Sequence, residues 1–484
     1  MLKFFTAESW SVVVIINYVV AVSAVITILL KNLNPTKTVS YIIVLIFFPF
    51  LGLLVYYLFG QEYRKNKIFN RKNVLNQNII KSIHEDLELS RQEIKEVDDL
   101  LDEKVKLVKL LYSSKFSPLT LRNKTTVIKN GESKLKHLKE DLAKAKNHIH
   151  LEYYILKDDS IGAEILNILA DKAANGIEVR ISYDDVGSSI SRAMKLKLKA
   201  SGVQMYPFMP VLFSSFTGKM NYRNHRKIVV IDGCVGYVGG INLADEYCNV
   251  EHCETYWRDT HLRIEGEAVK SLQTHFLTTW DFVSERKIKI TKDFFPDYTT
   301  EKDTAIQIAA SGPDTDWANI MEVMFVAMVS AEKYIYITTP YFVPNDQIIT
   351  AMQVAARSGV DVRLLIPYKS DSWIVKHATN SYLERILEAG VKVFRYKKGF
   401  VHAKTLAIDD IFCTVGTSNM DYRSFNINFE INAFMYDKKN TEILKQHFLE
   451  DLEQSEAVDF NTYLNRSKFD KLKESYARLW SPLI

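Results

Sequence analysis

The chain opens with two almost wholly apolar runs, at residues 11–31 and 38–59, separated by a short polar loop that contains Pro35. Each run holds about 20 residues, the length of helix that crosses a hydrocarbon core of roughly 30 Å. The first run leads into the second instead of a small-residue cleavage site, which disfavours a signal peptide. No polar face interrupts either run, which disfavours buried core helices. Residues 1–62 are therefore predicted to form a two-helix transmembrane hairpin.

Basic residues gather behind the second run. Residues 64–72 carry five Lys or Arg, whereas the loop between the runs carries only Lys31 and Lys37. Cytoplasmic flanks are enriched in such residues, so we expect a multi-pass protein of the cytoplasmic (inner) membrane with its N-terminus and its body in the cytoplasm. The basic cluster is an ordinary stop-transfer signal and would also attract anionic headgroups of the bilayer. Residues 63–122 continue as a basic, helical linker with apolar residues at helical spacing.

Beyond residue 122 the hydrophobic pattern repeats, over residues 123–300 and again over 301–484. In the first half, predicted strands at 148–155 and 176–181 flank a helix at 161–174; in the second, strands at 334–341 and 359–365 flank a helix at 348–356. Strands that alternate with helices form βαβ units. This predicts an α/β fold of two similar halves, each with a mixed, largely parallel sheet flanked by helices.

Each half contains the same short motif. His225-Arg226-Lys227 is followed by Asn242, and His402-Ala403-Lys404 is followed by Asn419, 17 residues after the histidine in both copies. Apolar β-branched residues surround each His-x-Lys, so we expect it on a strand with His and Lys on one face. The recurrence predicts one active site shared by the two halves.

The residue types of this motif suit cleavage of a phosphodiester through a covalent intermediate. An imidazole with a pKa of about 6.5 can serve as nucleophile or as acid. Lys227 and Lys404 would place positive charge on the phosphate, and Asn242 and Asn419 would donate hydrogen bonds to its oxygens. A metal site is disfavoured because the lysines would repel a cation.

Four carboxylates complete the candidate site. Asp232 and Asp409 lie seven residues after their histidines; we expect them to hold local architecture, and a turn cap is the simplest interpretation. Matching residues 257–262 with 428–433 makes Asp259 and Glu430 the candidates that orient the imidazoles. In the first half, Glu246 and Glu254 are alternatives to Asp259.

Composition changes this picture little. A formal net charge of +4 neither favours nor excludes nucleic acid, and four cysteines are too few for a disulfide framework. Cys248 and Cys253 lack a second pair at zinc-finger spacing. No cofactor motif occurs, and we expect none. The unusually apolar stretch 206–216 either enters a lipid interface or packs on the core as a lid.

These motifs resemble the phospholipase D superfamily, and in particular its bacterial cardiolipin synthases. The resemblance covers nearly the whole chain and is weakest over 73–124; the segments that carry it are 35–38, 57–60, 222–227, 239–247, 401–405 and 423–430. One departure is Thr417-Ser418, where many members have Ser first. The family implies catalytic roles for both His, Lys and Asp sets. It also implies phosphatidyl transfer between two phosphatidylglycerol molecules, with His225 as nucleophile and His402 as acid and base.

Three other functions stay open on these residues. A membrane-bound phospholipase D would let water or another alcohol resolve the intermediate. An inactive membrane scaffold on the same fold is disfavoured by two intact motifs. A nuclease has no need of an anchor, so we expect lipid partners and no nucleic acid.

Overall fold

The computed structural model describes residues 7–30, 35–48, 50–53, 56, 87, 93, 105–112, 117–209, 222–251, 253–284, 288–298, 300–301, 303–313, 315 and 317–483. These residues fall into an N-terminal unit, up to residue 56, and a larger unit that contains both predicted halves. Of the predicted linker 63–122, only residues 87, 93, 105–112 and 117–122 are described. Of the apolar stretch 206–216, positions 210–216 lie outside the described residues.

The N-terminal unit consists of α1 (Ala7–Leu30) and α2 (Pro35–Phe47), which pack on each other through Ala21, Ile28 and Leu45. Among the described residues, only Ser11–Leu30 is long and apolar enough to cross a membrane, with a mean hydropathy of 2.7. After α2, residues 50–53 and 56 are helical again, and the rest of the predicted second span lies outside the described residues. One span is thus supported, and the second span of the hairpin is not confirmed.

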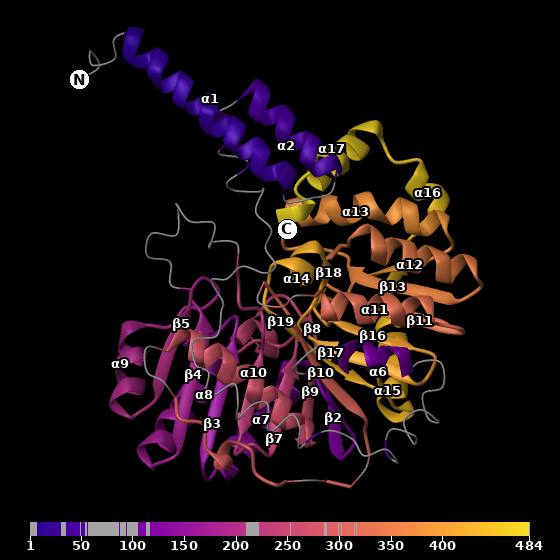
Figure 1. Ribbon diagram of the computed structural model, residues 1–484. Helices are drawn as coiled ribbons and strands as arrows, with labels where there is room; N and C mark the ends of the chain where they lie inside the picture. Colours follow the sequence, from indigo (N-terminus) through magenta and orange to yellow (C-terminus); the bar gives the residue numbers. More distant parts are fainter. Residues whose placement is uncertain are drawn as a thin grey trace. The chain divides into compact units, whose positions relative to one another are not determined.

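The larger unit contains two sheets with one shared strand order (Figure 1). The seven-stranded sheet runs β2-β9-β7-β6-β3-β4-β5, and the second sheet repeats this order as β10-β19-β17-β16-β11-β13-β14, extended by β1 and β20 at its edges. The strands of the first sheet are β2 (Asn123–Lys129), β3 (His148–Tyr153), β4 (Glu178–Asp184), β5 (Gln204–Phe208), β6 (Ile228–Ile231), β7 (Val235–Gly239) and β9 (Thr260–Gly266). Those of the second are β1 (Leu119–Thr120), β10 (Ile306–Ser311), β11 (Tyr334–Thr338), β13 (Asp361–Pro367), β14 (Lys392–Tyr396), β16 (Thr405–Ile408), β17 (Phe412–Gly416), β19 (Glu430–Met435) and β20 (Ser455–Ala457).

Both sheets are mixed, but the expectation that they are largely parallel is wrong. In the seven-stranded sheet only β3-β4 and β4-β5 are parallel, and the other four pairings are antiparallel. One antiparallel pairing in each sheet comes from a tight turn after the motif strand, where Asp232, Gly233, Asp409 and Asp410 all have positive φ. Two consecutive residues in this region fold the chain back into a hairpin, so β6-β7 and β16-β17 pair antiparallel.

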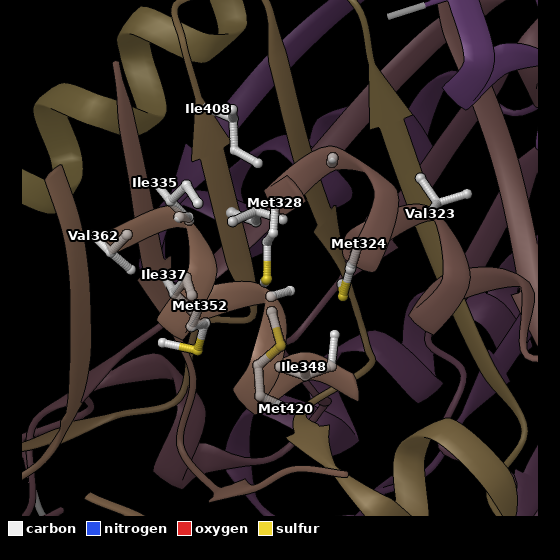
Figure 2. Packing of buried hydrophobic residues seen from close by; sticks show 14 of the residues in the cluster. Val323, Met324, Met328, Ile335, Ile337, Ile348, Met352, Val362, Ile408 and Met420 are labelled. Carbon is white, nitrogen blue, oxygen red and sulfur yellow. The ribbon is translucent and has the colours of Figure 1, made fainter. Parts of the chain in front are cut away.

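Helices cover the outer face of each sheet. In the first half these are α7 (Asn130–Lys144), α8 (Ser160–Ala174) and α9 (Arg192–Ala200); in the second half they are α11 (Asn319–Val329), α12 (Asp346–Arg357) and α13 (Trp373–Glu388). Their starts are encoded locally, since the Asp159 and Asn345 side chains cap α8 and α12 by accepting the N–H of the third residue on. Figure 2 shows the second-half core, where Met324, Met328 and Met352 pack against aliphatic strand residues. The short helix α6 (Val105–Tyr112) joins this core, so the end of the predicted linker belongs to the second half.

The inner faces of the two sheets pack against each other. One apolar cluster combines Val230, Val238 and Leu262 of the first sheet with Val415 and Ile431 of the second. Two helices, α10 (Ala268–Val283) after β9 and α15 (Lys438–Glu453) after β19, contribute further residues to the cluster. This packing fixes the two halves against each other, and it sets the distance between their motifs.

Candidate active site

Each His-x-Lys motif lies just before its strand and pairs with the opposite half. Residues 225–227 precede β6, and residues 402–404 follow β15 (Phe400–Val401) and precede β16. The His225 N–H donates to Phe429 O at 2.9 Å, and the His402 N–H donates to Arg258 O at 2.7 Å. β15 pairs in parallel with β8 (Trp257–Arg258) of the first half. The prediction that each His-x-Lys lies on a strand is therefore wrong: both triplets lie just before β6 and β16, where their backbone bonds to the opposite half.

This exchange gives each histidine a carboxylate from the other half. His225 Nδ1 lies 2.9 Å from Glu430 Oε2, and His402 Nδ1 lies 2.7 Å from Asp259 Oδ2. All four side chains are buried. A carboxylate only accepts, so each Nδ1 carries the proton and each Nε2 keeps a free lone pair. Two imidazoles are thus oriented at one seam, and neither half could orient its own.

The strand register places Asp259 and Glu430 at equivalent positions. Gly239 pairs with His261 in the first sheet, and Gly416 pairs with Asn432 in the second. Asp259 lies two residues before His261, and Glu430 lies two residues before Asn432. The two acids are therefore equivalent, as the matching of residues 257–262 with 428–433 predicts. The alternatives lie elsewhere: Glu246 forms an ion pair with Lys157 at 3.1 Å, and Glu254 is exposed.

The two acids are supported differently. Thr417 Oγ1 donates to Glu430 Oε2 at 2.5 Å and accepts the Ile431 N–H at 2.9 Å. Gly240 occupies the position of Thr417 in the first half, and there the shorter Asp259 accepts the Thr260 N–H itself at 2.7 Å. A Cβ on Gly240 would lie 2.2 Å from Asp259 Oδ1. Gly240 beside Asp259 and Thr417 beside Glu430 therefore fill equivalent space next to the two imidazoles.

Two buried lysines provide positive charge beside the rings. Lys227 Nζ donates to His225 O at 2.7 Å, and Lys404 Nζ donates to His402 O at 2.5 Å. Burial lowers the pKa of Lys404 to about 8 and that of Lys227 well below its ordinary value. For Lys227, the negative charge of Glu430 opposes this lowering of the pKa, and the positive charge of Lys404 adds to it. Charges of the second half therefore act on a lysine of the first. A bound phosphate anion would offset the repulsion between the ammonium groups.

Both histidines are neutral near pH 7. Burial lowers the pKa of His225 to about 4 and that of His402 to about 3. Lys404 lowers both pKa values further, while Glu430 and Asp259 partly oppose the change. Aromatic rings enclose the imidazoles: Tyr154 lies 5.0 Å from His225 between ring centroids, and Trp257 lies 5.2 Å from His402.

The remaining predicted residues take supporting positions. Asn242 Oδ1 accepts the Ile155 N–H at 3.1 Å, and its amide also interacts with the Tyr247 hydroxyl. The Asn419 N–H donates to Ser424 Oγ at 3.3 Å, and Asn419 Oδ1 is buried without a hydrogen-bond partner among the described residues. The Asn242 side chain therefore supports the segment after β7, whereas Asn419 is held by its backbone, and hydrogen bonding of either amide to a phosphate stays a prediction.

Asp232 and Asp409 bind backbone amides at the start of β3 and β11. The Asp232 carboxylate accepts the N–H groups of residues 146–148 at 2.8–2.9 Å, and Asp409 accepts those of residues 332–334 at 2.8–3.0 Å. The geometry favours the architectural role expected for both carboxylates.

Sequence reasoning missed Lys134, a buried lysine on α7. Its Nζ donates to Ile241 O at 3.0 Å, the carbonyl that precedes Asn242, and burial lowers its pKa to about 7. Ile320 occupies the corresponding place on α11 and is apolar. A lysine at helical spacing in a basic helix looks like a surface residue, so no pattern identifies it.

Comparison with known proteins identifies the family of the chain. The family model for the cardiolipin synthase, phospholipase D-like domain matches residues 138–280 and 324–452, which are the two sheet-bearing halves. A second model, for the phospholipase D-nuclease N-terminal region, matches residues 19–61. The chain belongs to the cardiolipin synthase family of phospholipase D-like proteins.

Relatives in this cardiolipin synthase family match almost end to end. The chain is 42% identical to a cardiolipin synthase of Halalkalibacterium halodurans, over 95% of this chain and 91% of the relative. It is 39% identical to that of Listeria monocytogenes, over 95% and 96%. Among solved structures, a phosphatidylserine synthase of Haemophilus influenzae aligns with a TM-score of 0.59 and 15% identity, over 78% of this chain and all of that one. That likeness supports the fold alone.

Proposed function

We propose that this chain is a phosphatidyltransferase that joins two phosphatidylglycerol molecules into cardiolipin and releases glycerol. The observation that carries the proposal is the crossed pairing of His225 with Glu430 and of His402 with Asp259. It supplies two oriented imidazoles at one seam, which is what a two-step transfer through a covalent intermediate requires. The cardiolipin synthases to which the chain is similar give the substrate class.

In the first step the neutral Nε2 of His225 attacks the donor phosphorus. A nitrogen–phosphorus bond forms, the bond to the glycerol oxygen breaks, and His402 gives that oxygen its proton. His402 has a low pKa in the empty site; the anionic phosphate adds negative charge beside it and raises that pKa toward the value an acid needs. Lys227 and Lys404 hold the non-bridging oxygens.

In the second step His402 removes a proton from the terminal hydroxyl of the acceptor lipid. That oxygen attacks phosphorus, the nitrogen–phosphorus bond breaks, and neutral His225 returns. The aromatic surroundings favour a lipid alcohol over water at this point. Trp257, Tyr247 and Phe400 lie 5.2, 5.7 and 6.1 Å from the His402 ring between centroids, and they limit the polar contacts that a free water molecule would need.

The N-terminal unit supports the same proposal. The span Ser11–Leu30 would hold the enzyme at the bilayer that contains both of its substrates, which raises their effective concentration. We propose that residues 38–59 form a second span, and that the halves lie in the cytoplasm behind the basic segment 64–72.

Product analysis tests this function. The full chain, in mixed micelles with phosphatidylglycerol labelled in its headgroup glycerol, should release one glycerol for each cardiolipin formed. Phosphatidic acid as the main product would contradict the transferase and favour a phospholipase D. His402→Ala should abolish both products, and full biological effect of that variant would favour a scaffold instead.

A further inference from the structure

The chain ends in a helix whose apolar side faces outward. After α16 (Phe460–Leu464), α17 (Lys468–Arg478) packs along α13, and a short turn of 3₁₀ helix, η7 (Ser481–Leu483), closes the described chain. The Tyr382 hydroxyl of α13 donates to Ser481 Oγ at 3.1 Å, which fastens this segment to the second half.

The residues that α17 buries are polar or small. Glu474 and Ala477 are buried against the protein, and Glu474 is paired with Arg466 at 3.0 Å. On the opposite side Phe469, Leu472 and Tyr476 are 66%, 65% and 53% exposed. A helix of a soluble domain normally turns its apolar stripe toward the core. The reversed orientation of α17 therefore needs an apolar environment outside the protein.

Neighbouring residues widen this stripe into a patch, which we call the C-terminal patch. It consists of large exposed apolar side chains from α16, α17, the following residues and the start of α13, namely Leu464, Phe469, Leu472, Tyr476, Leu479, Trp480 and Trp373. Exposed apolar side chains that recur along one helix and the segments next to it mark contact sites more often than scattered ones do. Two tryptophans and a tyrosine are residues that favour the boundary between headgroups and acyl chains.

The charged residues of α17 indicate which kind of surface it contacts. Lys468 and Arg478 are exposed at the two ends of α17, whereas Lys471 between them pairs with Glu384 of α13 at 3.8 Å. The two acids of the helix are engaged internally: Asp470 with Ser467 and Lys473, and Glu474 with Arg466. An apolar stripe bordered by basic residues is complementary to an anionic lipid surface.

The patch is linked to the candidate active site through the turn that follows it. η7 contacts α14 (Tyr422–Asn426), which begins three residues after Asn419. A membrane contact here would act on the same loop that carries one of the motif asparagines.

We infer that α17 lies in the headgroup region of an anionic bilayer, with its apolar stripe among the acyl chains, and holds the mouth of the site against the lipid surface. This rests on the proposed function only in that the substrates are bilayer lipids. The helix would be an attachment separate from the N-terminal span.

Photo-crosslinking of the full chain in phosphatidylglycerol vesicles tests this inference. p-Benzoylphenylalanine replaces Leu472 in one preparation and Gln446, an exposed position on α15 outside the C-terminal patch, in the control. Position 472 should form at least about fivefold more lipid adduct than position 446. Equal adducts from both positions, or an adduct of position 472 with protein from this chain or a second copy, would overturn the inference.

Activity separates this inference from the proposed function. The double variant Leu472→Ser/Tyr476→Ser removes exposed side chains and opens no cavity. It should lower cardiolipin synthesis about tenfold in vesicles, while mixed micelles, which bring lipid to the site without a bilayer, should show wild-type rates. Equal rates in vesicles would refute the membrane role of α17. Phosphatidic acid from the wild type in micelles would instead refute the proposed function and leave the crosslinking result standing.

Discussion

Gly240→Ala should disable His402 without touching it. A Cβ at this position would lie 2.2 Å from Asp259 Oδ1 and 2.8 Å from Asp259 Cγ, where ordinary contact begins near 3.4 Å. To restore 3.4 Å between the new Cβ and Oδ1, which would start 2.2 Å apart, Asp259 must move by about 1.2 Å. Its hydrogen bonds to His402 Nδ1 and to the Thr260 N–H are both 2.7 Å long, so a shift of this size breaks at least one of them. The backbone itself is no obstacle, because Thr417 bears a side chain at the equivalent position.

The expected loss follows from this displacement. A misplacement of about 1 Å at a catalytic group costs on the order of 100-fold in rate, about 3 kcal/mol. We expect kcat for cardiolipin formation in micelles to fall by about that factor, with KM nearly unchanged because both lysines stay in place. Headgroup glycerol release and cardiolipin yield should fall together.

A double-mutant cycle decides whether the effect passes through the carboxylate. Asp259→Ala removes the atoms that the new Cβ would strike, so Gly240→Ala should have little further effect in that background. Thermal unfolding of each variant controls for loss of fold. Full activity in Gly240→Ala, or losses that multiply in the double variant, would refute the reasoning.

Three further predictions follow from the described contacts. Asp232→Asn weakens the acceptor for three backbone N–H groups. Thermal unfolding should show a loss of about 1–3 kcal/mol in unfolding free energy, and micelle assays should show kcat within about twofold of the wild type. A large loss of kcat in a stable variant would argue for a direct catalytic role. Lys404 has a pKa of about 8, so kcat/KM should fall as pH rises through that value while the ammonium loses its proton, and a flat profile to pH 9 would contradict this. Burial lowers the pKa of His150 to about 3, so this histidine stays neutral in the folded protein at pH 4 but is protonated in the unfolded chain, where its pKa is about 6.5. This difference should lower the unfolding free energy at pH 4 by about 3 kcal/mol. His150→Gln should therefore reduce the fall in thermal midpoint between pH 7 and pH 4, and an unchanged fall would refute the prediction.

The repeat and its chemistry could be predicted because they are local in sequence. His225 and Asn242 recur as His402 and Asn419 at one spacing, and alternating apolar residues mark the strands beside them. These local patterns did not predict the direction of the strands, which depends on the turn after each motif strand. Asp232 was expected to hold local architecture, most simply as a turn cap, and the pattern did not indicate that its positive φ folds β6 and β7 into an antiparallel hairpin.

Contacts between the halves could not be predicted, because they depend on packing. His225 and Glu430 are 205 residues apart, and matching the halves identifies the acids without saying which histidine each one serves. The answer lies in the apolar inner faces of the two sheets, which bring each motif against the opposite half. Lys134 is a similar case, since only the packing of α7 against residue 241 shows that it is buried.

Covalent trapping tests the central claim, that both motifs act on one phosphate, most directly. The wild-type chain is mixed in micelles with phosphatidylglycerol carrying a labelled phosphate, quenched with alkali within the first turnover, and digested for peptide mapping. The account predicts an acid-labile phosphatidyl group on His225, at most one per chain, and none in the His225→Ala/His402→Ala variant. Label on His402 in a His225→Ala variant at the same yield, or two labels per wild-type chain, would mean two independent sites and would contradict it.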